Sequence, residues 1–264
     1  MMVASPLSMS RPLAGATLVV TRPSSTSAPL SERIRRLGGS VVRVPGLSLR
    51  AASSVGVLSL FDRADAFDAC IFSSPAAVRY ARETLPSLQI APRGRVFAIG
   101  AGTALALARH GVLAVTPDER SDSEGLLELP ALASVEGRRI ALVGAPGGRD
   151  LIASALRRRG ATLEEIHVYE RAAPRLTRKH FDALAGAEDP LITLLSSAEA
   201  LGHLVELLPT ALLQRLQRQS LVVSSERLAD IASGRGFSSI FRAASATPAD
   251  LVEGAARALA HHRL

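Results

Sequence analysis

The sequence predicts an α/β fold made of two similar domains, and three observations lead to this prediction. At 264 residues the chain exceeds the ordinary length of one domain, and 47% of it is hydrophobic, which is enough for two cores. Short β-rich runs alternate with helical stretches almost from end to end. The second half of the chain repeats the first.

The alternation begins with a strand over residues 16–21, "ATLVVT". A helix is expected around "LSERIRRLGG", because Leu30, Ile34 and Leu37 share one face at helical spacing, and a strand at "SVVRVP" follows. Gly38 lies where this helix should stop, as C-terminal capping glycines do.

The middle of the chain continues the pattern. Strands are expected at "ACIFSS", "RVFAIG" and "VLAVT". Helices are expected from Pro75, through "TALALARHG" up to Gly111, and at "SEGLLELPAL". Pro75 suits the first helical position, where its missing N–H is not needed. Strands that alternate with helices of this length predict parallel sheets covered on both faces.

The repeat is visible as matched glycines and serines at nearly constant offsets. The pairs are Gly15 with Gly137 and Gly38 with Gly160 at 122, Ser73–Ser74 with Ser196–Ser197 at 123, and Gly111 with Gly236 at 125. An offset that drifts by a few residues is typical of a duplicated unit with small loop changes. The repeat therefore predicts two similar, flavodoxin- or Rossmann-like domains.

The composition of the chain indicates which kinds of ligand and partner it could bind. The formal charge is +7, which favours anionic ligands, but the arginines are spread along the chain and only 3% of residues are aromatic. This pattern argues against a nucleic-acid-binding module. No apolar run approaches the roughly 18 residues of a membrane span. The six histidines lack paired helical spacing, so no metal site is expected.

Cys70 is the single cysteine and lies in an apolar run. It cannot form a disulfide within the chain, which favours a reducing, cytoplasmic compartment. A small buried side chain is a better interpretation of Cys70 than a nucleophile. The first dozen residues lack the features of a signal peptide, and residues 1–13 are expected to form a flexible tail.

Two apolar strands end on serine pairs, Ser73–Ser74 and Ser196–Ser197, directly before a helix. In open α/β sheets, ligands bind beyond the carboxyl ends of the strands, where helix N-termini favour anions. Helix capping is the simpler role for each serine alone. Their recurrence favours a cleft between the two domains that holds a multiply anionic ligand, with Arg22 and Arg149 assisting.

Seven pieces of the sequence together resemble the uroporphyrinogen-III synthase family. They are "VTRP" (20–23), "FSSPAAV" (72–78), "AIGAGTALAL" (98–107), "SEGLLEL" (123–129), "VYER" (168–171), "LLSSAEAL" (194–201) and "TPADLVEG" (247–254). The resemblance implies a monomeric, cofactor-free hydro-lyase of haem biosynthesis. Such an enzyme closes the linear tetrapyrrole hydroxymethylbilane to uroporphyrinogen III, with inversion of the last pyrrole ring and loss of water.

The resemblance also implies that the chain crosses between the domains twice, whereas the repeat alone permits a tandem arrangement. One domain would combine residues 14–44 with 173–264, and the other would span 48–168. Two crossing linkers would lie near 45–47 and 169–172.

The resemblance implies a role for Tyr169 as the acid that assists departure of the hydroxyl, although packing at the linker is an equal alternative. A phenol stays protonated at neutral pH, as a weak acid should. Thr103 would bind a carboxylate or cap its helix. The remaining positions implied to contact substrate are Arg22, Ser73, Ser74, Ser123, Arg149, Ser196, Ser197 and Ser225.

The sequence departs from the family at two places. Ala76 stands where many members carry Arg or Asn, so it offers no polar contact. Some members have a Thr pair after the strand equivalent to "LVVSS", where Ser224, Ser225 or Arg227 would have to substitute.

Two other functions share the same fold class. A nucleotide-dependent enzyme is suggested by "GAGTAL" at Gly100 with Asp118 downstream, but Leu105 replaces the third glycine of the dinucleotide fingerprint. A non-catalytic sensor of a small anionic ligand would also use two such domains, and fold class alone does not decide between them.

Overall fold

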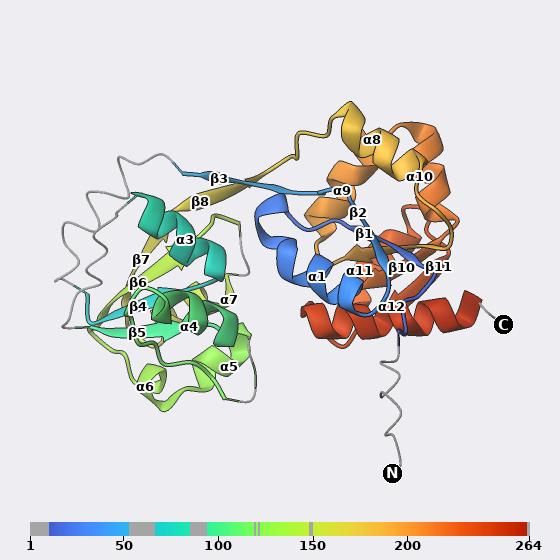
Figure 1. Cartoon of the computed structure of the whole chain (residues 1–264). Helices are drawn as coiled ribbons and strands as arrows, with labels where there is room; N and C mark the ends of the chain where they lie inside the picture. Colours follow the sequence, from blue (N-terminus) through green and yellow to red (C-terminus); the bar gives the residue numbers. More distant parts are fainter. Residues whose placement is uncertain are drawn as a thin grey trace, which may run out of the picture. The chain divides into compact units, whose positions relative to one another are not determined.

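The computed structural model describes residues 11–52, 67–84, 94–118, 120, 122–147 and 150–262. The chain divides into two compact units, which are drawn in Figure 1. Unit 1 comprises Met1–Ser48 and Ala172–Leu264, and unit 2 comprises Leu49–Arg171, so the chain passes between the units twice. Each unit is built on a parallel sheet, which confirms the predicted α/β fold class.

Unit 1 contains a five-stranded parallel sheet in the order β11-β10-β9-β1-β2. The strands are β1 (Thr17–Val20), β2 (Ser40–Arg43), β9 (Leu191–Leu195), β10 (Ser220–Val223) and β11 (Ser239–Arg242). The three central strands β1, β9 and β10 are buried along their whole length. Strands buried on both faces read as continuous apolar runs, which is why "TLVV" and "LITLL" lack polar alternation.

Helices cover the sheet of unit 1 on two sides. They are α1 (Ala28–Arg36), α8 (Arg178–Ala185), α9 (Ala198–Leu207), α10 (Thr210–Gln217), α11 (Glu226–Ser233) and α12 (Pro248–His262), with a short 3-10 helix η1 (Ser24–Thr26). Leu18 and Val20 of β1 pack with α1 and α12, whereas Val19 packs into the cluster that includes α9 and α11. Adjacent side chains thus enter cores on opposite faces, as the two-residue period of a strand requires.

Unit 2 contains a four-stranded parallel sheet in the order β5-β4-β6-β7. The strands are β4 (Ala69–Phe72), β5 (Arg95–Ala98), β6 (Arg139–Gly144) and β7 (Thr162–His167). The strand expected at "VLAVT" is wrong, because that segment pairs with the sheet only through a bridge from Val115 to Phe97. Leu113 is 90% exposed, so it adds no apolar contact that would extend the pairing.

The helices of unit 2 follow the predicted order, and two of them begin at the expected residues, Pro75 and Ser123. They are α3 (Pro75–Thr84), α4 (Ala101–Ala108), α5 (Ser123–Glu128), α6 (Pro130–Ala133) and α7 (Leu151–Arg158). The single helix expected at "SEGLLELPAL" is divided into α5 and α6. Leu129 between them is extended, because the residue before a proline disfavours helical geometry.

The two units repeat one strand order. The series β2-β1-β9-β10-β11 of unit 1 corresponds to β7-β6-β4-β5 and the Val115 bridge of unit 2. The glycines matched in sequence also share a left-handed backbone. Their φ angles are 81° at Gly15 and 70° at Gly137, 88° at Gly38 and 82° at Gly160, and 75° at Gly111 and 87° at Gly236. Glycine adopts this conformation without steric cost, so these positions preserve the turns of the duplicated unit.

Residues 169–172, predicted to be a linker, form strand β8 (Tyr169–Ala172), which pairs with β3 (Ser48–Ala51) in a two-stranded sheet. The two points where the chain passes between the units fall in these strands. The predicted tail ends earlier than residue 13. Leu13 is fully buried, and its N–H donates to the carbonyl of Leu37 at 3.1 Å. Residues 1–10 of that tail lie outside the described residues. Within the described part of the chain, no helix has the length and apolar character needed to cross a membrane.

Cys70 lies in β4 with 7% of its surface exposed, and burial raises the pKa of its thiol to about 11. Thiol reagents react with the thiolate form of cysteine. With such a pKa, about one protein molecule in a thousand would carry the Cys70 thiolate at pH 8. We expect no labelling of the folded protein at pH 8 and one equivalent after denaturation, as counted by mass spectrometry. The labelling rate should rise with pH up to about pH 11; rapid labelling of folded protein at pH 8 would contradict the buried position.

Candidate active site

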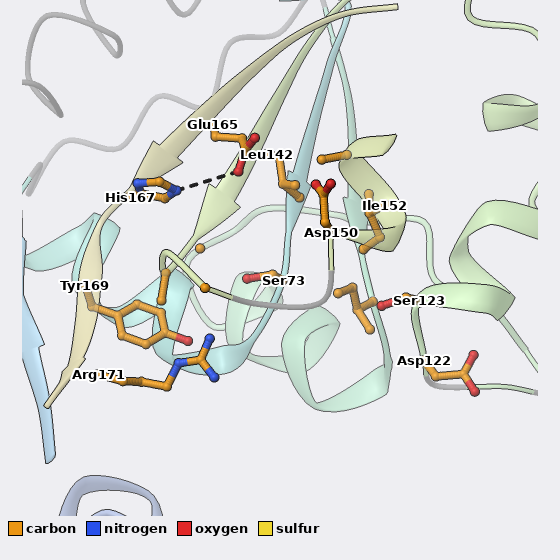
Figure 2. A pocket seen from close by; sticks show the side chains of 15 residues that line it. Ser73, Asp122, Ser123, Leu142, Asp150, Ile152, Glu165, His167, Tyr169 and Arg171 are labelled. Carbon is orange, nitrogen blue, oxygen red and sulfur yellow. Dashed lines mark ion pairs between the residues drawn. The ribbon is translucent and has the colours of Figure 1, made fainter. Parts of the chain in front are cut away.

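A cavity of about 650 Å³ lies within unit 2, at the carboxyl ends of its strands (Figure 2). Strands β4 and β6 are neighbours in the sheet, but β5 and β7 continue from them in opposite directions. Such a reversal of strand order leaves a crevice, which is where open α/β sheets bind ligands. The lining residues are Ser73, Ile99, Asp122, Ser123, Leu142, Gly144, Ala145, Gly147, Asp150, Ile152, Ala153, Glu165, His167, Tyr169 and Arg171.

Local structure explains why polar side chains collect in this cavity. Glu165 and His167 occur two residues apart on β7, and Tyr169 follows at the same interval at the start of β8. A two-residue period places such side chains on one face of an extended segment. Asp122 and Ser123 stand at the start of α5, and Asp150 stands before α7, so helix N-termini form the opposite wall.

Gly144, at the end of β6, leaves the space that Ser73 occupies. A Cβ atom at this position would lie 2.4 Å from the Ser73 Oγ and 3.3 Å from its Cβ. Atoms this close cannot coexist, so any larger residue would displace the serine hydroxyl. Gly144 therefore allows the Ser73 hydroxyl to keep its position at the cavity wall.

We expect Gly144→Ala to raise KM for the substrate about two- to tenfold, since a displaced Ser73 loses a hydrogen bond worth about 0.5–1.5 kcal/mol. Steady-state kinetics would measure the change. The matched control is Gly202→Ala in α9, where the added methyl group meets nothing within 4 Å. It should preserve KM and slightly stabilise the helix. An unchanged KM for Gly144→Ala would contradict a contact between Ser73 and substrate.

Tyr169 is 9% exposed and reaches the cavity with its hydroxyl group (Figure 2). Its hydroxyl lies 3.1 Å from the Ser74 Oγ, and the same Oγ accepts the N–H of Ala77 at 3.1 Å. The Tyr169 ring stacks on Tyr80, with ring centroids 5.4 Å apart and planes inclined by 21°. The Tyr80 hydroxyl donates to the carbonyl of Leu49 at 2.8 Å. Tyr169 is thus held by both its ring and its oxygen.

The carboxylates of the cavity wall have cationic or N–H neighbours. Glu165 pairs with Arg157 at 2.7 Å, and its other oxygen lies 3.7 Å from the His167 Nε2. Asp150 lies 4.0 Å from Arg157. Such pairing offsets the negative charge that would otherwise repel an anionic ligand.

Asp122 and Arg171 are two further charged residues of the cavity wall. Asp122 accepts the Gly125 N–H at 2.8 Å and pairs with Arg120 at 2.9 Å. Arg171 donates to the carbonyl of Pro146 at 3.2 Å and presents its positive charge at the cavity wall. Within the described ranges, no three His, Cys, Asp or Glu side chains gather closely enough to hold a metal ion.

The structure brings some of the predicted site residues together. Ser73, Ser123 and Tyr169 line the cavity, and Ser74 contacts Tyr169 directly. Arg149 lies outside the described residues.

Thr103 does not open α4, so the capping alternative considered for it is wrong, whereas its contact with a carboxylate stays a prediction. The residue before the helix is Gly100, no side-chain cap is present, and Thr103 is the third helical residue with 4% of its surface exposed. Thr103 is also absent from the cavity lining.

The remaining predicted residues belong to unit 1. Ser197 accepts the Ala200 N–H at 3.3 Å and caps α9, and Ser225 accepts the Leu228 N–H at 3.4 Å and caps α11. Capping, the simpler role considered for single serines, is therefore present at both. Neighbouring Ser196 is half-buried. Roles for these serines in substrate binding, and the cleft expected between the domains, stay predictions.

Arg22 follows β1 in unit 1. Its Nη2 donates to the carbonyl of Ala246, and its Nε is buried with no hydrogen-bond partner among the described residues. Burial lowers the pKa of the guanidinium from its ordinary value, because desolvation disfavours the charged form. A half-buried guanidinium with a free N–H is suited to an anionic group, and the contact of Arg22 with a carboxylate stays a prediction.

Sequence reasoning missed five polar residues of the cavity: Asp122, Asp150, Glu165, His167 and Arg171. The sequence did contain a pattern that could have predicted two of them. Glu165 and His167 alternate with Tyr169 at a two-residue spacing, which places their side chains on the same face as the predicted tyrosine. No comparable local signal marked Asp122 or Asp150, which reach the cavity only through the fold of unit 2.

Comparisons with known proteins identify the family. A family model described as "Uroporphyrinogen-III synthase HemD" matches residues 28–253. The chain belongs to the uroporphyrinogen-III synthase family. It is 34% identical over 243 residues to the uroporphyrinogen-III synthase of Salmonella typhimurium, with 85% of this chain and 93% of that protein covered. It is 32% identical over 239 residues to the Escherichia coli enzyme, at the same coverage.

Solved structures of uroporphyrinogen-III synthases share the fold. The enzyme from Helicobacter pylori aligns with a TM-score of 0.63 at 17% identity, over 91% of this chain and 98% of that one. A mutant enzyme from Thermus thermophilus aligns with a TM-score of 0.56 at 20% identity, over 93% and 99%. The predicted family and the predicted class, a hydro-lyase of tetrapyrrole biosynthesis, are confirmed by the family match and the relatives. The nucleotide-dependent and sensor alternatives are not supported.

Proposed function

We propose that this protein converts hydroxymethylbilane to uroporphyrinogen III without a cofactor, and that the cavity of unit 2 holds the reacting end of the substrate. The observation that carries this placement is the position of Tyr169. It brings a phenol, a proton donor at neutral pH, to the wall of a 650 Å³ cavity at the strand ends. The family match supports the reaction, and the geometry supports the location.

The first chemical step removes the substrate hydroxyl. The C–O bond breaks with its electron pair on oxygen, and Tyr169 donates its proton so that water leaves. The remaining azafulvenium cation can close spontaneously to the symmetric type I isomer. The enzyme's task is to hold the pyrroles so that attack occurs at the substituted carbon of the last ring, which leads through a spiro intermediate to the inverted type III isomer.

Substrate binding would rely on charge and on small residues. The substrate has eight carboxylates, and the chain carries a formal charge of +7. Arg171 lies at the cavity wall, and Gly144 and Ala145 let a ligand approach the backbone closely. Each carboxylate near a helix N-terminus would gain roughly 0.3–1 kcal/mol. Ser73 and Ser123 would add hydrogen bonds at the same wall.

A product assay tests the proposal. Purified protein receives freshly generated hydroxymethylbilane, and the oxidised uroporphyrin isomers are separated by chromatography. Type III isomer in proportion to added protein is the expected result. Type I isomer alone, the spontaneous product, would overturn the proposed reaction.

We further propose that the enzyme works as a cytoplasmic monomer that binds neither nucleic acid nor membranes. The single, buried Cys70 agrees with a reducing compartment. The scarcity of aromatic residues argues against nucleic-acid binding. Light scattering coupled to gel filtration would test the assembly, and a mass twice that of the chain would contradict it.

A further inference from the structure

The hydrogen bonds around Tyr169 allow an arrangement in which its own hydroxyl proton stays free. The Ser74 Oγ accepts the N–H of Ala77 at the start of α3, so its single hydroxyl proton remains to be donated. The Tyr169 hydroxyl oxygen lies 3.1 Å from this Oγ. If Ser74 donates to that oxygen, the phenolic proton of Tyr169 is free to point into the cavity, where it is needed.

The Tyr169 ring has little freedom to choose another arrangement. The ring stacks on Tyr80. Tyr80 in turn has a cation–π contact, because the guanidinium carbon of Arg79 lies 4.3 Å from the centroid of the Tyr80 ring. The ring partner Tyr80 is a buried residue of α3, and the hydroxyl partner Ser74 stands directly before this helix. The oxygen of Tyr169 is consequently fixed beside the N-terminus of α3.

We propose that Ser74 is a positioning residue that donates a hydrogen bond to Tyr169 and connects its phenol oxygen to the N-terminus of α3. The inference rests on the proposed function of Tyr169 as the acid. When Tyr169 gives its proton to the departing hydroxyl, a phenolate remains. The Ser74 hydroxyl then donates to an anion, and the Ala77 N–H polarises that hydroxyl. Both effects are stronger in the transition state than before it, which is the condition for raising kcat.

The proton balance closes without another reactant. Water leaves with the Tyr169 proton. Attack first bonds the carbon that lost the hydroxyl to the substituted carbon of the last ring, which carries no hydrogen, and gives the spiro intermediate. The bond from that substituted carbon to its methylene bridge then breaks, and the bridge carbon bonds to the free α-carbon of the same ring, which loses its hydrogen as a proton. The phenolate accepts that proton, and the Ser74–Tyr169 pair returns to its starting state with a net loss of one water from the substrate.

A double-mutant cycle tests the coupling between Ser74 and Tyr169. We expect Ser74→Ala to lower kcat about tenfold with little change in KM, because a hydrogen bond to a charged group is lost. In a Tyr169→Phe background the same change should have no further effect on kcat, since Ser74 then has no phenol to assist. Ser74→Thr, which keeps a hydroxyl, should restore most of the rate.

Helix capping by Ser74 is the competing explanation, and two variants separate it. Ser74→Gly removes the hydroxyl but keeps a residue that starts helices well, so it serves if Ser74→Ala does not fold. Thr247→Ala removes a comparable cap, because the Thr247 Oγ1 accepts the Asp250 N–H at 3.2 Å at the start of α12. Thr247→Ala should lower thermal stability and leave kcat unchanged.

The outcomes are distinct. Equal losses of kcat from Ser74→Ala with and without the Tyr169 hydroxyl would overturn the positioning role, as would a loss confined to KM. If the unmodified protein forms no type III isomer, the proposed function itself fails. If it forms type III isomer and the cycle shows no coupling, only the role of Ser74 fails.

Discussion

Replacing Tyr169 with Phe is expected to lower kcat about a hundredfold, the lower end of what general acid catalysis contributes. The ring and its stacking on Tyr80 are retained, so the fold should survive. Activity should not vanish, because binding in the cavity still orients the pyrroles after slow, unassisted loss of the hydroxyl. The product mixture should shift toward the type I isomer as the enzymatic reaction slows against the spontaneous one.

Initial rates of type III formation, measured at several substrate concentrations, would separate kcat from KM. The chain contains only one other tyrosine, which makes Tyr80→Phe the matched variant. That change removes the hydrogen bond to Leu49 and should cost stability, but it should reduce kcat far less than Tyr169→Phe. A Tyr169→Phe enzyme with the turnover of the unmodified protein would rule out the acid role and leave packing at β8 as the function of this residue.

Phe72→Ala is expected to lower the free energy of unfolding by about 3–5 kcal/mol. Phe72 ends β4, is fully buried, and packs in the main core cluster of unit 2 beside Val143, Ile166 and Tyr169. Truncation removes the burial energy of the ring and leaves a cavity that the parallel sheet cannot readily close. A loss of this size is comparable with the total stability of many domains.

Urea unfolding followed by circular dichroism would measure this change. Leu113→Ala is the matched control, because it also truncates an apolar side chain to alanine but at a position that is 90% exposed. It should change the free energy of unfolding by less than about 0.5 kcal/mol. Similar small losses from both variants would contradict the core position of Phe72.

Several parts of the fold could be predicted from sequence because they depend on neighbouring residues. The apolar run "LVV" defines β1, and Pro75 marks the first residue of α3. Pro130 divides the helix predicted at "SEGLLELPAL", because the residue before a proline disfavours helical geometry. This division could therefore have been predicted from the sequence. The strand expected around Val115 was wrong for another reason. Strand pairing depends on partners distant in sequence, and among the described residues this segment pairs with the sheet at Val115 alone, while Leu113 is exposed.

Some residues of the candidate site could likewise be predicted from the sequence, and others could not. Ser73, Ser123 and Tyr169 were predicted from motifs at strand and helix ends, and all three line the cavity. Asp122 and Asp150 were not predicted, because a carboxylate beside a helix start most often caps it or faces solvent. Thr103 follows the expected strand, yet the close packing of α4 buries it away from the cavity.

The sequence by itself determined the α/β class, the duplicated unit and the small or hydroxyl residues at strand ends, since periodicity and turn chemistry act over a few residues. Only the tertiary structure decided which strands are neighbours. A tandem and a crossed arrangement contain the same local segments, and long-range packing alone places β4 beside β6. That adjacency brings Ser73, Gly144 and Glu165, which are far apart in the chain, to the wall of one cavity.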